Sequence, residues 1–347
     1  LTITSVAIQY SYIGLDFVTG LPTQLPQFVI NSLDINIPQF QVVTGLFDVC
    51  PDIKIADLFI GILKQFNLVC YGIAENVYQV EPLDSWYQKG SIIDITEHTI
   101  PDNIDVERVK LYKRISMGYQ ESKSFMNRQF KKLTEREYGN ALLDRNVDDG
   151  AEYKIELPFE NLLFSKFTDN NLQVGYNLEE APDYKPYTPK PTILYKYGNL
   201  STSFKFNGLF PTTLTAYNAF GQDALINGEV HTLNFNAEVS TLTNEIEINT
   251  LFADYYNGYL DNLYNLKNRI VKVKTLLPIS ILTGLRLNDR VVIRDKRYII
   301  NNMQSDLTTG EVALELINDF RPILSVGGTF PVSSIAGCYI LPVLLGN

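Results

Sequence analysis

The sequence predicts a mainly β protein with a few helices, of the α+β class. Short apolar runs alternate with polar residues along much of the chain, and Gly, Pro and Asn separate these runs as they separate strands. The chain contains 21 Tyr and 19 Phe, residue types that are enriched in strands and at protein interfaces. Only a few stretches repeat apolar residues at helical spacing. At 347 residues, the chain is long enough for two or three domains.

The first clear helical pattern follows a β-rich N-terminal segment, residues 1–50. Apolar residues between Ile55 and Phe66 recur at steps of three and four, which predicts a helix that ends near Asn67. Two apolar runs within residues 68–83 flank a short polar turn, which predicts a β-hairpin. We expect the helix to cover one face of this hairpin with five buried side chains: Leu58, Phe59, Ile62, Leu63 and Phe66.

The middle of the chain is predicted to consist mostly of short strands. They are expected over residues 91–118 and 146–159, with a helix around residues 124–138 between them. Four prolines within residues 181–191 predict a rigid surface connection, and a polyproline ligand is the less favoured alternative. The evenly spaced β runs of residues 192–239 are typical of a sandwich or a small barrel.

The second strong helical pattern is rich in aromatic residues. It extends from Asn249, the predicted N-cap, to about Tyr264, and its apolar residues recur every four positions in adjacent pairs. A stripe this wide is broad enough to serve both a core and a neighbouring subunit. The tyrosines of this helix are therefore the candidate interface residues: Tyr255, Tyr256, Tyr259 and Tyr264.

Strands are predicted again after this helix. Residues 269–275, 290–301 and 311–317 each have the composition of a strand. The apolar run of residues 335–346 is shorter than the roughly 20 residues of a membrane-spanning helix and contains Pro342, so we expect a strand or a docking tail. In the strand over residues 311–317, three alternate residues are expected on one buried face: Val312, Leu314 and Leu316.

The charge of the chain disfavours two classes of partner. The formal net charge is −10, and an acidic surface repels nucleic-acid phosphates and anionic membranes. The densest basic run, Arg128, Lys131 and Lys132, is followed at once by Glu135 and Glu137. We therefore expect no nucleic-acid binding and no membrane insertion. The three cysteines are spaced neither as metal ligands nor as a disulfide framework, which suits synthesis in a reducing compartment.

The sequence lacks the motifs that would indicate an enzyme. The two histidines, His98 and His231, have no second metal ligand nearby, and the serine-hydrolase, phosphate-loop and dinucleotide motifs do not occur. We therefore expect no catalytic residue, no metal site and no cofactor. Four carboxylates surround an Asp-Gly turn, where solvated side chains are favoured over a glycosidase pair: Asp144, Asp148, Asp149 and Glu152.

Two separated blocks carry a resemblance to a known family. The first is IADLFIGILKQFNLVCYGIAENVYQVEPLDSWYQKGSIIDIT, residues 55–96, a helix that leads into a hairpin. The second is GLRLNDRVVIRDKRYIINNMQSDLTTGEVALELIND, residues 284–319, in which a turn at Asn288-Asp289 precedes a hairpin and a final alternating strand. Together these blocks resemble the tail hub proteins of tailed bacteriophages, a family that includes the late control protein D type and the baseplate hubs of contractile tails.

The resemblance implies two barrel-like hub domains with an inserted β-rich and helical region. It also implies a virion protein without catalytic residues, synthesised in the host cytoplasm and located in the tail or baseplate. Such a hub joins the tail tube to a spike or fibres as a homo-oligomer, with a trimer as the first expectation. The expected units are an N-terminal segment, a first hub barrel, an inserted region, a closing barrel segment with the aromatic helix, and a C-terminal extension: 1–50, 51–118, 119–248, 249–320 and 321–347.

Two other classes of function remain open from the sequence. Trp86 and Tyr87 could stack a sugar, which together with the short strands suggests a receptor- or carbohydrate-binding β protein of a phage tail. The favoured interpretation of Trp86 is a plug at the end of the preceding hairpin. The scattered carboxylates suggest a cell-wall hydrolase module, with weaker support.

Overall fold

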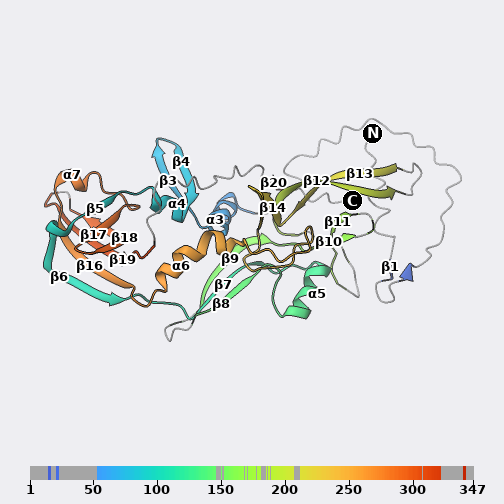
Figure 1. Ribbon diagram of the computed structural model, residues 1–347, viewed down its shortest axis with the longest axis horizontal. Helices are drawn as coiled ribbons and strands as arrows, with labels where there is room; N and C mark the ends of the chain where they lie inside the picture. The colour runs from blue at the N-terminus through green and yellow to red at the C-terminus, as the bar shows by residue number, and fades with distance from the viewer. Residues whose placement is uncertain are drawn as a thin grey trace.

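The computed structural model describes most of the chain between residues 53 and 321. The described residues are 53–145, 150, 152–167, 169, 171–176, 178–180, 185, 187, 189–206, 212–306 and 308–321, with the backbone of 15–16, 21–22 and 339–340. Strands predominate and helices are few, so the mainly β prediction is confirmed. The largest sheet, which has six strands, lies at one end of an elongated molecule in Figure 1, and the long hairpin of β12 (Ile193–Phe206) and β13 (Thr212–Gly221) lies towards the other end.

The largest sheet joins strands from two distant parts of the sequence. Neighbouring strands within this sheet run antiparallel, except that the first two strands in the order given next are parallel. The order across the sheet is β5 (Ile92–Asp94), β17 (Arg290–Ile293), β18 (Lys296–Ser305), β19 (Glu311–Asn318), β16 (Arg269–Leu276) and β6 (Thr99–Arg108).

The main core of this sheet lies on one face, as the strand period predicts. Val312, Leu314 and Leu316 alternate on that face and are almost fully buried, which confirms the prediction for β19. The short helix α7 (Ile279–Leu282) contributes Leu282 to the same core.

The described strands form no closed barrel, and the prediction of barrel-like domains is not confirmed. Strands β5 and β6 follow one another in the chain through Ile95 and the short 3₁₀ helix η2 (Thr96–His98), yet they occupy opposite ends of the strand order. The ladder between β6 and β16 is also interrupted, because Thr99 pairs with Thr275 and the next pair is Ile104 with Val273. The sheet therefore stays open along one side of β6.

A second core forms around a three-stranded sheet in the middle of the molecule. Strand β7 (Arg114–Gln120) lies between β8 (Ala141–Asp144) and β9 (Glu152–Glu160). The helix α3 (Ile55–Gln65) packs against β9. A Cβ atom on Gly61 of this helix would lie 2.7 Å from atoms of Pro158 and Phe159, so the close approach requires glycine at this position.

The predicted helix and hairpin both exist, but the buried face of the helix differs from the prediction. Leu58, Ile62, Leu63 and Phe66 are only partly buried, and Leu58, Ile62 and Phe66 pack against the second core, whereas the prediction had them buried against the hairpin. Phe59 is 43% exposed, so its predicted burial is wrong. The residues completing the buried stripe are Gly61 and Gln65. The helix covers β9 as well as the hairpin, which is formed by β3 (Leu68–Ala74) and β4 (Val77–Pro82).

The remaining elements are short helices and hairpins. The helix expected around residues 124–138 is present, and the β runs of residues 192–239 yield two hairpins. The predicted strands of residues 1–50 and 321–347 lie outside the described residues, apart from β1 (Leu15–Asp16), β2 (Leu21–Pro22) and β20 (Tyr339–Ile340). The other elements are α4 (Leu83–Gln88), α5 (Phe125–Thr134), β10 (Phe164–Phe167), β11 (Leu172–Gly175), β12 (Ile193–Phe206), β13 (Thr212–Gly221), β14 (Asp223–Ile226), β15 (Glu229–Thr232), η3 (Phe252–Tyr256) and α6 (Asn257–Leu263).

Candidate functional site

The two blocks that carry the family resemblance contact one another directly. The Asp289 carboxylate accepts a hydrogen bond from the backbone N–H of Ser91 at 2.7 Å. The Asn288 side-chain amide donates to the carbonyl of Trp86 at 3.0 Å. A Cβ atom on Gly90 would lie 1.9 Å from the Asn288 carbonyl oxygen, so a side chain at position 90 cannot be accommodated. The turn singled out from the sequence thus connects the second block to the first.

A buried cluster of charges holds the same junction together. The Asp319 side chain is 0% exposed, and its oxygens lie 3.1 Å from Nε of Arg290, 3.3 Å from Nε of Arg297 and 2.8 Å from Nε of Arg321. Arg321 also donates to Asp84 of α4 at 2.7 Å. Three guanidinium groups therefore face two carboxylates, and they link α4 to β17, β18 and the end of β19. Sequence reasoning missed this cluster, because Asp84 is 237 positions from Arg321 and the other members belong to different strands or follow them.

Burial at this junction shifts the titration of neighbouring groups. Burial raises the pKa of the Asp84 carboxyl above its ordinary value, and Arg321 partly opposes that shift. The Arg321 guanidinium lies 5.1 Å from the centre of the Tyr87 ring, and burial raises the pKa of Tyr87 to about 12. The ring of Trp86 packs 5.0 Å from Tyr87 and 6.3 Å from Tyr71 of the hairpin. Trp86 is thus packed at the base of the hairpin, as the favoured interpretation predicts.

The aromatic helix lies between the two sheets in Figure 1; it belongs to the second core and also packs against a smaller buried cluster of Tyr87, Ile299 and Ile317. Its first part, η3, is a π-helix, and α6 continues it. Tyr256 donates a hydrogen bond to the carbonyl of Lys64, and the Tyr255 ring meets Phe66 edge-on at 5.5 Å. Tyr259 packs against the second core on one side and against the Tyr87 cluster on the other.

The last candidate tyrosine also binds within its own chain. The Tyr264 hydroxyl donates to the carbonyl of Tyr112 at 2.6 Å, and the Arg145 guanidinium lies 5.2 Å from the Tyr264 ring centre. All four tyrosines therefore contact other parts of the same chain, and the second core together with the cluster around Tyr87 accounts for the width of the stripe. A place for these tyrosines between subunits stays a prediction.

The predicted N-cap of this helix is displaced by one residue. The Thr250 hydroxyl accepts a hydrogen bond from the backbone N–H of Ala253 at 3.1 Å, as an N-cap does. The Asn249 side chain instead donates to the carbonyl of Val230 at 3.0 Å. Thr250 is the cap because Asn249 is held by β15, with which it forms a bridge at His231.

Exposed apolar side chains concentrate on the hairpin and its neighbouring helix, which we call the helix–hairpin element (α3, β3 and β4). The hairpin projects from the body of the molecule in Figure 1. Tyr78 near its tip is 69% exposed. The base is fixed, because the buried Glu81 carboxylate accepts a hydrogen bond from the Tyr71 hydroxyl at 2.6 Å and pairs with Lys89. The other exposed apolar side chains of the element are Ile55, Phe59, Ile60, Ile73, Val77 and Val80.

The histidines and carboxylates considered as catalytic or metal-binding residues do not gather at one site. His231 lies in β15 and its Nδ1 is 2.7 Å from Oδ2 of Asp254, while His98 lies in η2. Asp144 pairs with Arg114 at 2.9 Å, and Asp148 and Asp149 are outside the described residues. Within the part of the chain that the structure describes, no group of three or more His, Cys, Asp or Glu side chains is arranged to hold a metal ion.

The basic run of α5 is neutralised by carboxylates. Arg128 and Lys131 bind Glu121 at 2.8 and 3.0 Å, and Lys132 binds Glu180 at 2.6 Å. These cations therefore offer no unopposed basic patch.

Comparison with protein-family models found no matching family, and comparison with curated proteins found no match. Among the described helices, none combines the length and the apolar character needed to cross a bilayer.

Proposed function

We propose that this protein is a structural virion protein, a tail or baseplate hub that joins the tail tube to a spike or fibres. The resemblance of residues 55–96 and 284–319 motivates the proposal. The observation that carries it is the helix–hairpin element, which displays apolar side chains on a firmly held projection. Contiguous exposed apolar surface is typical of a site where another protein binds.

The element is suited to contacts between copies of this chain. Each copy has a net charge of −10, so association must overcome a repulsion that salt screens. Burial of residues such as Tyr78, Ile73 and Val77 supplies an attraction that does not depend on charge. In a closed ring, the same element of every copy meets a second surface of its neighbour, and three copies is our first expectation.

The mass of the full chain in solution tests the proposal. Size-exclusion chromatography with light scattering should give a trimer whose mass is unchanged at high salt. Each pair of subunits should bury at least about 1,000 Å². A double variant, Ile73→Asp with Tyr78→Asp, should shift the mass to that of a monomer, because it places charges in the apolar contact.

A matched control places the same charge on an exposed leucine elsewhere. Leu133 of α5 is highly exposed, so Leu133→Asp should leave the mass unchanged. A wild-type chain that stays monomeric at high micromolar concentration contradicts the proposal. A double variant that keeps the wild-type mass contradicts the role of the hairpin.

The alternative of a carbohydrate-binding protein rested on Trp86 and Tyr87. Both rings are engaged within the chain, with Tyr71 and with the Arg321 guanidinium. A sugar would have to displace these contacts in order to stack there, so the arrangement favours the structural role.

A further inference from the structure

Strand β6 is an edge strand with one described neighbour. It ends the strand order of the six-stranded sheet, and its residues 104–108 pair with β16 on one side only. Figure 1 shows β6 running along the outside of the molecule. Because alternate residues of a strand direct their N–H and C=O groups to opposite sides, the outer edge offers hydrogen-bonding groups to a further strand.

The core face of the sheet continues onto β6 without a cover. Ile104 pairs with Val273 and Val106 pairs with Val271, so each pair shares one face of the sheet. The two β16 residues are buried in the core, with Val273 only 3% exposed. Ile104 and Val106, in contrast, are 39% and 57% exposed. This face therefore lacks an apolar neighbour beyond β6.

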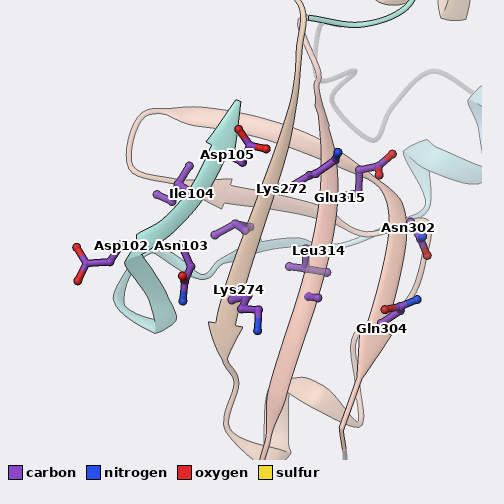
Figure 2. A pocket seen from close by; sticks show the side chains of 12 residues that line it. Asp102, Asn103, Ile104, Asp105, Lys272, Lys274, Asn302, Gln304, Leu314 and Glu315 are labelled. Atoms are coloured by element: carbon purple, nitrogen blue, oxygen red, sulfur yellow. The ribbon is translucent and has the colours of Figure 1, made fainter. Parts of the chain in front are cut away.

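The opposite face of β6 is acidic and borders a hollow of about 480 Å³. Figure 2 shows this hollow across the outer face of the sheet, with Asp102 and Asp105 on the β6 side and Asn302 and Gln304 on the far side. Lys272 on its floor is bound by Glu107 at 2.7 Å.

The lysines of the hollow form their ion pairs with carboxylates other than Asp102 and Asp105. Lys274 is bound by Glu311 at 2.7 Å, outside the hollow. Among the residues that the structure describes, neither Asp102 nor Asp105 forms an ion pair within 4.0 Å. The charge on this face is therefore suited to a basic partner.

We propose that the free edge of β6 binds an extended segment of a partner protein in which apolar residues alternate with lysine or arginine. In this mode the apolar residues cover Ile104 and Val106, and the basic residues face Asp102 and Asp105. The backbone of the segment adds one strand to the sheet. This inference goes beyond the proposed hub function and holds whether or not the chain forms a ring.

Charge argues against a second copy of β6 as the occupant. Pairing β6 with itself would place Asp105 and Glu107 of both copies on one face, and like charges across a strand pair are destabilising. The chain already contains the favoured pattern, because β16 places Val271 and Val273 beside the apolar residues of β6 and Lys272 beside Asp105.

A peptide with the sequence of β16, RIVKVKTL, is therefore a suitable probe. Labelled with a fluorophore, it should bind the full-length chain saturably in an anisotropy titration. Two control peptides should bind at least about tenfold more weakly. One has the same composition in an order that separates the valines from the lysines, and the other has Glu in place of Lys and Arg. Hydrogen exchange of amides 104–108 should slow when the alternating peptide is added.

Variants of the full chain locate the binding. Val106→Asp should weaken binding of the alternating peptide at least about tenfold, whereas Leu133→Asp, at the exposed leucine of α5, should not. Asp102→Asn with Asp105→Asn should weaken binding at low salt and reduce its salt dependence. If Val106→Asp disturbs the fold, the double asparagine variant alone tests whether the peptide binds at the β6 edge.

Several outcomes would overturn the inference. These are the absence of saturable binding by any of the peptides, equal binding of the alternating and control peptides, and unchanged affinity and salt dependence in the double asparagine variant. Protection of amides 104–108 that rises with protein concentration alone would assign the edge to a second copy and also refute it. A hub ring is judged separately by the mass of the chain, so either proposal can fail while the other stands.

Discussion

The buried charge cluster gives the sharpest test of how the two blocks are held together. Asp319→Asn keeps the shape of the side chain but removes the negative charge shared by Arg290, Arg297 and Arg321. Because Asp319 and Arg290 are almost fully buried, water cannot replace the lost carboxylate. Removing one partner of such a buried ion cluster costs about 3–5 kcal/mol of the free energy of unfolding.

Urea denaturation can measure this change directly. The chain has one tryptophan, and Trp86 packs against Tyr87, whose ring lies under Arg321, so its fluorescence should report unfolding of the junction. With a denaturant slope of about 2–3 kcal/mol per molar urea, the midpoint should fall by about 1–2.5 M. The slope itself should be unchanged, because the exposed surface on unfolding stays the same.

An exposed pair of the same chemical type provides the control. Asp144 and Arg114 lie 2.9 Å apart, but both side chains are at least half exposed. Asp144→Asn should therefore cost less than about 1 kcal/mol. If the two asparagine variants have the same midpoint, the reasoning that burial makes the Asp319 cluster important is refuted.

Three further tests concern the packing and the ionisation of the core. Gly61→Ala should lower the free energy of unfolding by about 1–3 kcal/mol, because the added methyl clashes with Pro158 and Phe159. Gly72→Ala is the control: nothing lies within 4 Å of its added methyl, so the urea midpoint should change little. Equal effects of the two variants would contradict the packing of α3. Phe159→Ala should lower the free energy of unfolding by about 3–5 kcal/mol. This is clearly more than the loss for Phe59→Ala, because Phe159 is fully buried and Phe59 is not. A larger loss for Phe59→Ala would show that the buried face of the helix is misassigned. Folding raises the pKa of Tyr87 to about 12 from an ordinary 10.0. The protonated hydroxyl therefore contributes fully to the free energy of unfolding below pH 10, and this contribution is lost as the pH rises to 12. Tyr87→Phe should make the free energy of unfolding fall less steeply between these pH values, and an unchanged slope would argue against the raised pKa.

The sequence was sufficient for elements with a clear period and insufficient where burial contradicts residue type. The period of two located β19, and the period of three to four located α3. The sequence predicted the wrong buried face for α3, because Phe59 is of a residue type common in cores, whereas Gly61 and Gln65 are not obvious core residues. The burial of Gln65 is partly compensated by the hydrogen bond that its amide N–H donates to the Tyr119 hydroxyl at 3.1 Å. These residues are 54 positions apart, so no local pattern encodes the contact.

Long-range pairing explains the other differences. The barrel prediction followed from a resemblance, but whether a sheet closes depends on pairing between strands that are distant in the chain. Here Thr99, the first residue of β6, pairs with Thr275 of β16, and the pairing resumes only at Ile104. The charge cluster was hidden for a similar reason, since Asp84 and Arg321 are 237 positions apart and each appears in the sequence as an ordinary surface charge.

The two exposed surfaces differ in a way that matches two kinds of assembly contact. The helix–hairpin element presents mainly apolar side chains, and apolar burial can join identical acidic chains despite their mutual repulsion. The β6 edge combines apolar residues with unpaired aspartates, and charge of one sign discriminates against the same chain while favouring a basic partner. A protein that must bind copies of itself and also an unlike partner needs both properties. Their separation on different elements allows each contact to be abolished without the other, which is why Tyr78 and Val106 are the positions at which the two proposals should be tested independently.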